Sequence, residues 1–152
     1  MAHLRMATAS SVAHIAIALL IAGMVAVAPI AHAADEGHYT AAQAQAGRTV
    51  YATNCALCHG ANLQGGSAPV LVGGKFTKSL QSDPMTAPQL YEFITSHMPG
   101  GEPGVLGDAQ FLQVFAFVLS MNGHPAGDRP LSRQTLGEVK LLPNPGAKQG
   151  TR

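Results

Sequence analysis

The feature that most constrains this chain is a five-residue stretch, Cys55-Ala56-Leu57-Cys58-His59, which contains its only two cysteines. Two residues separate the thiols, and the imidazole follows the second thiol directly. This spacing is the C-x-x-C-H attachment signature of a c-type haem. The two thiols add to the haem vinyl groups as thioethers, and the histidine binds the iron from one side. The stretch therefore predicts one covalent haem c, with Cys55 and Cys58 as attachment sites and His59 as an iron ligand.

Three alternative roles for the cysteine pair fit the sequence less well. A disulfide that closes so small a loop would be strained, and it leaves His59 without a role. A thioredoxin-type C-x-x-C follows a strand in a βαβ unit, and the sequence has no such pattern. A structural zinc site needs further ligands, usually a second closely spaced pair of cysteines or histidines, which is absent.

The N-terminal segment has the pattern of an export signal. Arg5 is the only charged residue before Asp35, and residues 15–28 form an uninterrupted run of apolar residues and glycine. This run is shorter than the ~20 residues needed to span a bilayer. Ala31-His32-Ala33 then places small residues where a signal peptidase cleaves. We therefore expect a signal peptide over residues 1–33 and a periplasmic protein. The alternative is a retained anchor, which would place the protein at the membrane.

Charge is sparse and balanced in the rest of the chain. The sequence has nine Lys and Arg residues and eight Asp and Glu residues, and Arg5 is the only one of these in the leader, so the two signs balance after residue 33. A nucleic-acid partner would require a clustered basic face, which is not seen. The chain also lacks a lysine-rich face that would steer it toward acidic partners. We expect contact with other proteins to rely on a small apolar patch near the haem.

Apolar periodicity predicts three helices, over residues 40–54, 86–98 and 108–122. A glycine-rich loop is expected from Gly60 to Gly74, and no strand is predicted. Glycine inside a helix costs up to ~1 kcal/mol relative to Ala, so Gly47 indicates a close backbone contact. The expected inward-facing residues are Ala44, Gly47, Val50 and Tyr51 in the first helix, Leu90, Phe93 and Ile94 in the second, and Phe111, Val114, Phe115, Val118 and Leu119 in the third.

The composition changes from His124 onward. Four prolines interrupt this segment, and few of its residues are bulky and apolar. One interpretation is a solvated tail, and the other is an extension that packs on the domain or on a partner. The sequence does not decide between them. We therefore divide the chain into a signal peptide over 1–33, a domain over 34–123 and a C-terminal tail over 124–152.

The presence of a second axial ligand decides what such an iron can do. A haem iron with one histidine ligand can bind small molecules, whereas a haem iron with two protein ligands transfers electrons. Met98 is the best candidate. It ends the second predicted helix, and Pro99 fixes the turn that follows. A thioether favours ferrous iron and raises the reduction potential. The alternative ligands are Met85, Met121 and His97. Met98 could also have no ligand role and only fill space in the core.

Several motifs together resemble class I cytochrome c over about residues 40–123. They are C-x-x-C-H near the start, the G-x-x-P-x-L-x-G stretch from Gly66 to Gly73, and Met98-Pro99 before a terminal aromatic helix. The resemblance implies an all-α fold with three main helices around a covalent haem, followed by an irregular C-terminal extension. The tail lies outside the resemblance.

The resemblance also implies roles for individual residues. The carbonyl of Pro69 accepts a hydrogen bond from the imidazole of His59, which orients the ligand, and Leu71 packs against the haem. Gly47 and Phe115 lie about where the first and last helices cross. Lys75 is a candidate partner for the haem propionates.

More closely, residues 51–60 and 98–106 resemble small cytochromes associated with quinoprotein (PQQ-type) alcohol dehydrogenases. This likeness implies an electron-transfer protein rather than an enzyme. It would accept electrons from a periplasmic quinoprotein dehydrogenase and pass them to an oxidase or another cytochrome. Two alternatives stay open. One is a gas- or peroxide-reactive haem protein with an open sixth site, and the other is a non-catalytic subunit whose tail organises a larger complex.

Overall fold

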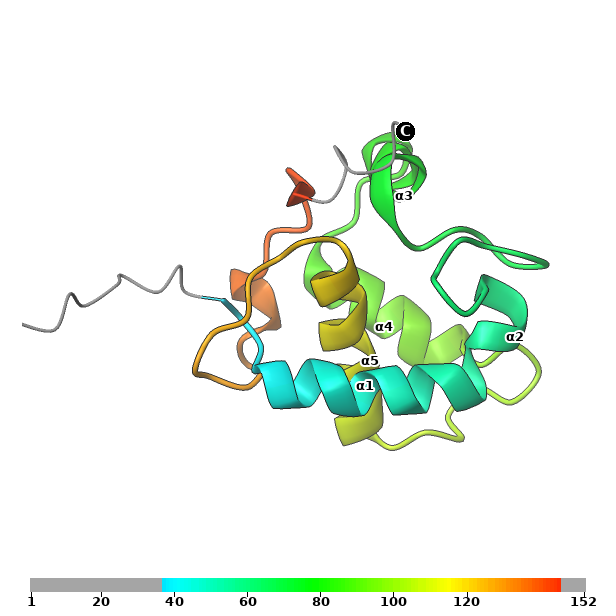
Figure 1. Cartoon of the computed structure of the whole chain (residues 1–152), viewed down its shortest axis with the longest axis horizontal. Helices are drawn as coiled ribbons and strands as arrows, with labels where there is room; N and C mark the ends of the chain where they lie inside the picture. Colours follow the sequence, from blue (N-terminus) through cyan, green and yellow to red (C-terminus); the bar gives the residue numbers. More distant parts are fainter. Residues whose placement is uncertain (1–36, 146–152) are drawn as a thin grey trace, which may run out of the picture. The chain divides into compact units, whose positions relative to one another are not determined.

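The computed structural model describes residues 37–145, which form five α-helices, one short 3-10 helix and no strand (Figure 1). The predicted all-α fold is confirmed. The expected signal peptide lies outside the described residues. Within residues 37–145, no helix is long and apolar enough to cross a membrane. The elements are α1 (Ala41–Asn54), α2 (Ala56–His59), α3 (Gly73–Ser82), α4 (Ala87–His97), α5 (Asp108–Met121) and η1 (Leu136–Glu138).

The three predicted helices correspond to α1, α4 and α5, and their N-terminal ends follow local chemistry. The Thr40 hydroxyl accepts a hydrogen bond from the Gln43 N–H (3.1 Å) and caps α1. Thr86 and Gln89 form a reciprocal capping box at the start of α4. Helix α4 ends before Met98, as expected from the proline that follows.

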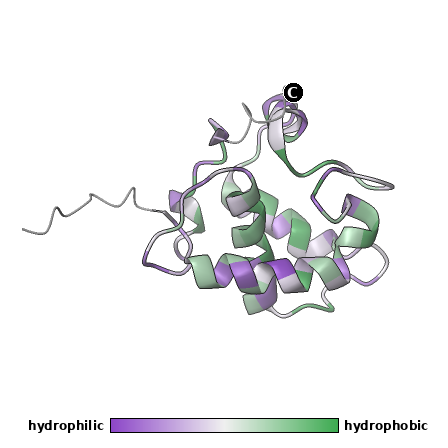
Figure 2. Cartoon of the chain, in the orientation of Figure 1, coloured by the Kyte–Doolittle hydropathy of each residue, from purple (hydrophilic) through white to green (hydrophobic). Residues whose placement is uncertain are grey.

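Helices α1 and α5 cross closely, and Gly47 lies at their contact. A Cβ atom added to Gly47 would collide with the backbone carbonyl of Gln113 on α5. The close backbone contact predicted at Gly47 is therefore confirmed. Along the same interface, Tyr51 and Phe117 pack with ring centroids 5.3 Å apart. In Figure 2, hydrophilic and hydrophobic residues are mixed along the visible face of α1, whereas α5 is more hydrophobic.

The expected glycine-rich loop is wrong at its last two residues, because Gly73 and Gly74 begin α3. Neither α3 nor the short helix α2 was predicted from the sequence. Helix α3 buries Phe76 and Leu80, four residues apart, against the core. Its first N–H, that of Gly73, donates to the side chain of Asn122 (3.0 Å). Packing and this long-range cap stabilise a helix that begins with two unfavourable glycines.

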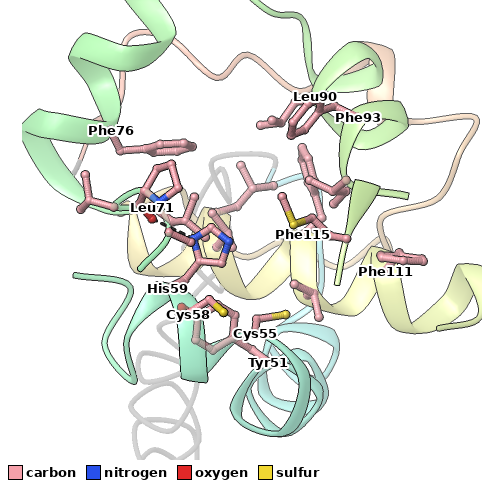
Figure 3. Close-up of a pocket in the computed structure, with 18 of the residues that line it drawn as sticks. Tyr51, Cys55, Cys58, His59, Leu71, Phe76, Leu90, Phe93, Phe111 and Phe115 are labelled. Atoms are coloured by element: carbon pink, nitrogen blue, oxygen red, sulfur yellow. Dashed lines mark hydrogen bonds between the residues drawn. The ribbon is translucent and has the colours of Figure 1, made fainter. Parts of the chain in front are cut away.

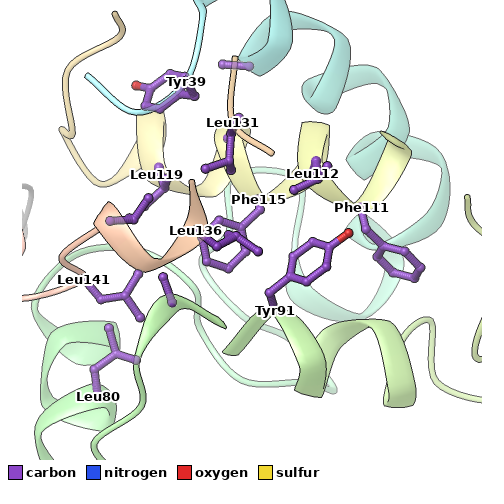
Figure 4. Close-up of a cluster of buried hydrophobic side chains, with 14 of the residues drawn as sticks. Tyr39, Leu80, Tyr91, Phe111, Leu112, Phe115, Leu119, Leu131, Leu136 and Leu141 are labelled. Atoms are coloured by element: carbon purple, nitrogen blue, oxygen red, sulfur yellow. The ribbon is translucent and has the colours of Figure 1, made fainter. Parts of the chain in front are cut away.

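The described part of the tail packs on the helices. We call residues 131–144 the strap. The backbone of Leu131 exchanges two hydrogen bonds of 2.8 Å with the side-chain amide of Gln43 on α1. Arg133 forms an ion pair with Asp108 at the start of α5 (2.6 Å). Figure 4 shows the strap leucines among side chains of α3, α4 and α5. The buried apolar residues of the strap are Leu131, Leu136, Val139 and Leu141.

Candidate functional site

A cavity of about 700 Å³ opens beside His59, and residues from α2, α3, α4, α5 and the strap line it (Figure 3). This volume lies within the range typical of cofactor and ligand sites, about 300–1,000 Å³. The walls are mostly apolar. They include all eight inward-facing residues predicted for α4 and α5, namely Leu90, Phe93, Ile94, Phe111, Val114, Phe115, Val118 and Leu119.

The imidazole of His59 is held in one orientation. His59 is buried, with 8% of its surface exposed. Its Nδ1 lies 2.7 Å from the carbonyl oxygen of Pro69, shown as the dashed line in Figure 3. Because a carbonyl can only accept, Nδ1 carries the proton in this contact. The other ring nitrogen, Nε2, is then the one that can bind a metal.

Short backbone hydrogen bonds fix the loop that carries Pro69. The N–H of Gly65 donates to the carbonyl of His59 (2.8 Å), and that of Leu71 donates to the carbonyl of Leu63 (2.8 Å). The core has two apolar clusters, a main one that contains Phe115 and a smaller one that contains Tyr51 and Phe117. Leu71 lines the cavity and packs against both. The motif residues Pro69 and Leu71 are thus placed beside His59 by the backbone of one short loop.

Both cysteines lie beside His59 at the edge of the cavity. Cys55 caps the C-terminal end of α1 and is half-buried, whereas Cys58 lies in α2 and is exposed. They form no disulfide. Burial raises the pKa of the Cys55 thiol to about 11, so the thiolate is scarce at neutral pH in this conformation. Cys55, Cys58 and His59 thus place two thiols and one imidazole in the wall of the same cavity.

Of the candidate second ligands, only two line the cavity. Met98 follows α4 and lies in the wall with Pro99, and Met85 lies in the segment before α4. The other two candidates do not line it. His97 is exposed, and its ring stacks on Phe93 with centroids 4.6 Å apart. Met121 packs in the smaller apolar cluster.

The residues around this cavity fit a haem of the c type. They supply two thiols at the required spacing, an imidazole whose Nδ1 is already engaged, and soft thioether sulfurs within apolar walls. Histidine and methionine are among the side chains that bind haem iron in proteins. The volume of the cavity is also sufficient for a large planar cofactor.

The contribution of the C-terminal residues to the cavity was not predicted from the sequence. Asn122, Leu141 and Asn144 line it, as does His124. Lys75, the candidate propionate partner, is exposed on α3 and does not line the cavity. Among the described residues that line it there is no lysine or arginine. No local sequence signal marks these asparagines, because their roles depend on segments that meet only in the fold.

Comparisons with known proteins identify the family and the cofactor. The sequence profile of the family described as cytochrome C oxidase, cbb3-type, subunit III, matches residues 42–118. The chain is also similar to the crystal structure of the sulfane dehydrogenase SoxCD from Paracoccus pantotrophus, with a TM-score of 0.52 and 31% sequence identity over 67% of this chain. It spans 54% of the chain in that structure. No curated protein sequence matches. The chain belongs to the cbb3-type cytochrome c oxidase subunit III family and is a monohaem c-type cytochrome with a covalent haem c.

Proposed function

We propose that this cytochrome is an exported one-electron carrier in which His59 and Met98 are the axial ligands. The observation that supports this most strongly is the cavity itself, which brings an oriented imidazole and a thioether into the same apolar walls. Cys55 and Cys58 are the proposed thioether attachment sites. When bound, haem c supplies one iron that alternates between the ferric and ferrous states.

The protein's own residues account for the carrier behaviour. Pro69 holds the imidazole of His59 in one orientation and increases its basicity. The apolar walls keep water out of the cavity and, together with the thioether of Met98, favour the ferrous state. A frame with two fixed protein ligands changes little between oxidation states, which keeps the reorganisation cost of electron transfer low.

We propose that the donor is a periplasmic dehydrogenase and the acceptor an oxidase or another cytochrome. A quinoprotein dehydrogenase is the donor implied by the sequence resemblance. The similarity to a sulfane dehydrogenase supports a dehydrogenase as partner in the broader sense. Leu57, which lies between the two cysteines and is 96% exposed, offers an apolar contact beside the cavity. Stopped-flow reduction of the cytochrome by a purified quinoprotein dehydrogenase and by a purified sulfane dehydrogenase tests the donor. Failure of both enzymes to reduce it would contradict this part of the proposal.

Visible spectra test the axial ligands. In the protein expressed with haem-maturation machinery, we expect a weak far-red band in the ferric state from sulfur ligation, and no change when CO is added to the reduced form. Met98→Ala should lose the far-red band and bind CO. Met85→Ala is the matched control, because Met85 lines the same cavity, and it should keep both properties.

Other outcomes would contradict the proposal in different ways. Loss of the band in Met85→Ala alone would make Met85 the ligand. A five-coordinate ferrous wild-type protein that binds CO at once would replace the carrier by a gas- or peroxide-reactive haem protein.

A further inference from the structure

Two buried asparagines connect the strap to the loop that orients His59. Asn122 follows α5 and is 1% exposed, and Asn144 is the last residue of the strap and is 6% exposed. Both line the cavity around His59. Because buried amides are costly unless their hydrogen bonds are satisfied, the partners of these two side chains show what they hold together.

Asn122 clamps the loop on both sides of Val72. Its Nδ2 donates to the carbonyl of Leu71 (2.9 Å), and its Oδ1 accepts from the N–H of Gly73 (3.0 Å). Nδ2 also donates to the carbonyl of Val118 (2.9 Å). These backbone groups fix the orientation of the amide, because a carbonyl only accepts and an N–H only donates.

Asn144 must therefore act as a donor. Its Nδ2 lies 2.8 Å from Oδ1 of Asn122, the atom that already accepts from Gly73. An acceptor at this position would place two lone pairs against each other. The chemistry required at residue 144 is consequently a side chain of this size that carries an N–H group.

The clamp lies close to the contact that orients His59. Leu71, whose carbonyl Asn122 binds, is two residues after Pro69, whose carbonyl lies 2.7 Å from Nδ1 of His59. The N–H of Leu71 is also bound, to Leu63. Movement of the loop at Leu71 or Gly73 would therefore displace the Pro69 carbonyl.

The strap is anchored independently of Asn144. Gln43 binds the backbone of Leu131, Arg133 pairs with Asp108, and Leu136 is buried in the main core. A change of the Asn144 side chain can thus remove its hydrogen bond to Asn122 while these other contacts of the strap are kept.

We propose that Asn144 is a positioning residue for His59. The hydrogen bond that it donates to Asn122 keeps the loop clamped at residues 71–73, and this fixes the Pro69 carbonyl against the imidazole. The inference rests on the proposed function in one respect, that His59 is an axial ligand.

The test uses the full haem-loaded protein labelled with ¹⁵N. Asn144→Asp keeps the size of the side chain and replaces the donor with an acceptor, and Asn144→Leu removes the donor without adding charge. Two readouts report on the loop held by Asn122. They are the NMR shift of the His59 Nδ1 proton in the reduced state and the hydrogen-exchange rate of the Gly73 amide. In both variants we expect the Nδ1 proton to move upfield and Gly73 to exchange roughly tenfold faster, the effect of losing one buried hydrogen bond.

Two controls separate positioning from general loosening. Asn62→Ala removes an exposed asparagine, and Leu136→Ala weakens the packing of the strap without touching the clamp. Both should leave the Nδ1 proton in place. The proposal is overturned if the Asn144 variants leave both readouts unchanged, or if Leu136→Ala shifts the proton equally. Failure of His59 ligation is distinguishable, because it appears in the wild-type spectrum before any variant is measured.

Discussion

At Gly47, the backbone of α5 lies too close to α1 for a side chain to fit. An added Cβ would meet the backbone of Gln113, which cannot move aside as a side chain can. We predict that Gly47→Ala lowers the free energy of unfolding by about 1–3 kcal/mol, the cost of overpacking a well-packed interface. This loss exceeds the gain of up to ~1 kcal/mol in helix propensity. Denaturant unfolding of the haem-loaded protein measures it.

Gln45→Ala provides the comparison for Gly47→Ala. Gln45 is an exposed residue of the same helix, so its replacement should change the free energy of unfolding by no more than about 0.5 kcal/mol. If Gly47→Ala were as stable as Gln45→Ala, the close approach of α1 and α5 would not exist in solution.

Residues within contiguous motifs could be predicted from the sequence, whereas residues that act across the fold could not. His59 and its neighbour Pro69 belong to motifs of fixed spacing, and the structure contains the contact expected between them. Asn122 was interpreted only as the end of a helix, which is correct for its backbone. Its side chain instead binds a loop some 50 residues earlier and Asn144 in the strap. No periodicity or propensity indicates such a contact.

Among the helices too, those with local sequence signals were predicted, and the one that depends on tertiary contacts was not. Helices α1, α4 and α5 show apolar periodicity together with recognisable caps, or a proline at their end, and they were predicted within one or two residues. Helix α3 begins with Gly73 at a φ of 69° and has no local side-chain cap. Its stability depends on packing by Phe76 and Leu80 and on Asn122, which are tertiary contacts that a local pattern does not contain.

For the strap as an element, a pair of leucine substitutions tests whether it packs as the structure shows. Leu136 is 3% exposed and Leu57 is 96% exposed. We predict that Leu136→Ala lowers the free energy of unfolding by about 2–5 kcal/mol, as for other buried leucines, whereas Leu57→Ala changes it little. Guanidinium unfolding followed by haem absorption measures both. Equal and small effects would support the alternative of a solvated tail.

Across the whole molecule, the beginning of the described chain meets the start of the C-terminal segment. The N–H of Gly127 donates to the carbonyl of Tyr39 (2.7 Å), and the Tyr39 hydroxyl donates to the carbonyl of His124 (2.6 Å). Nδ1 of His38 lies 3.8 Å from Oε2 of Glu138 in the strap. The sequence pattern assigns Tyr39 to the domain and Leu131 and Leu136 to the tail, whereas in the structure these three residues belong to one apolar cluster. The burial of the tail leucines could not be predicted, because they stand singly in a proline-containing segment and show no regular period.

His124 lies where these segments meet and gives the whole molecule a predicted pH dependence. It lines the cavity around His59 and a second cavity of about 430 Å³, which His38, Glu138 and Lys140 also line. Burial lowers the pKa of His124 below its ordinary value of 6.5, and the nearby His38 lowers this pKa further. The unfolded chain therefore binds this proton more readily than the folded protein does. The contribution of His124 to stability is complete above about pH 6.5 and is lost as the pH falls from there through the lower pKa of the folded state.

We predict that His124→Gln reduces this dependence, so that its free energy of unfolding falls less between pH 7.5 and pH 5.5 than that of the wild type. Guanidinium unfolding at the two pH values measures the difference. The value at pH 7.5 gives the packing cost of the substitution, because His124 is then largely neutral in both states. Equal pH dependence in the two proteins would mean that His124 takes up its proton equally well in the folded and unfolded states, and that the segments around it leave it open to water.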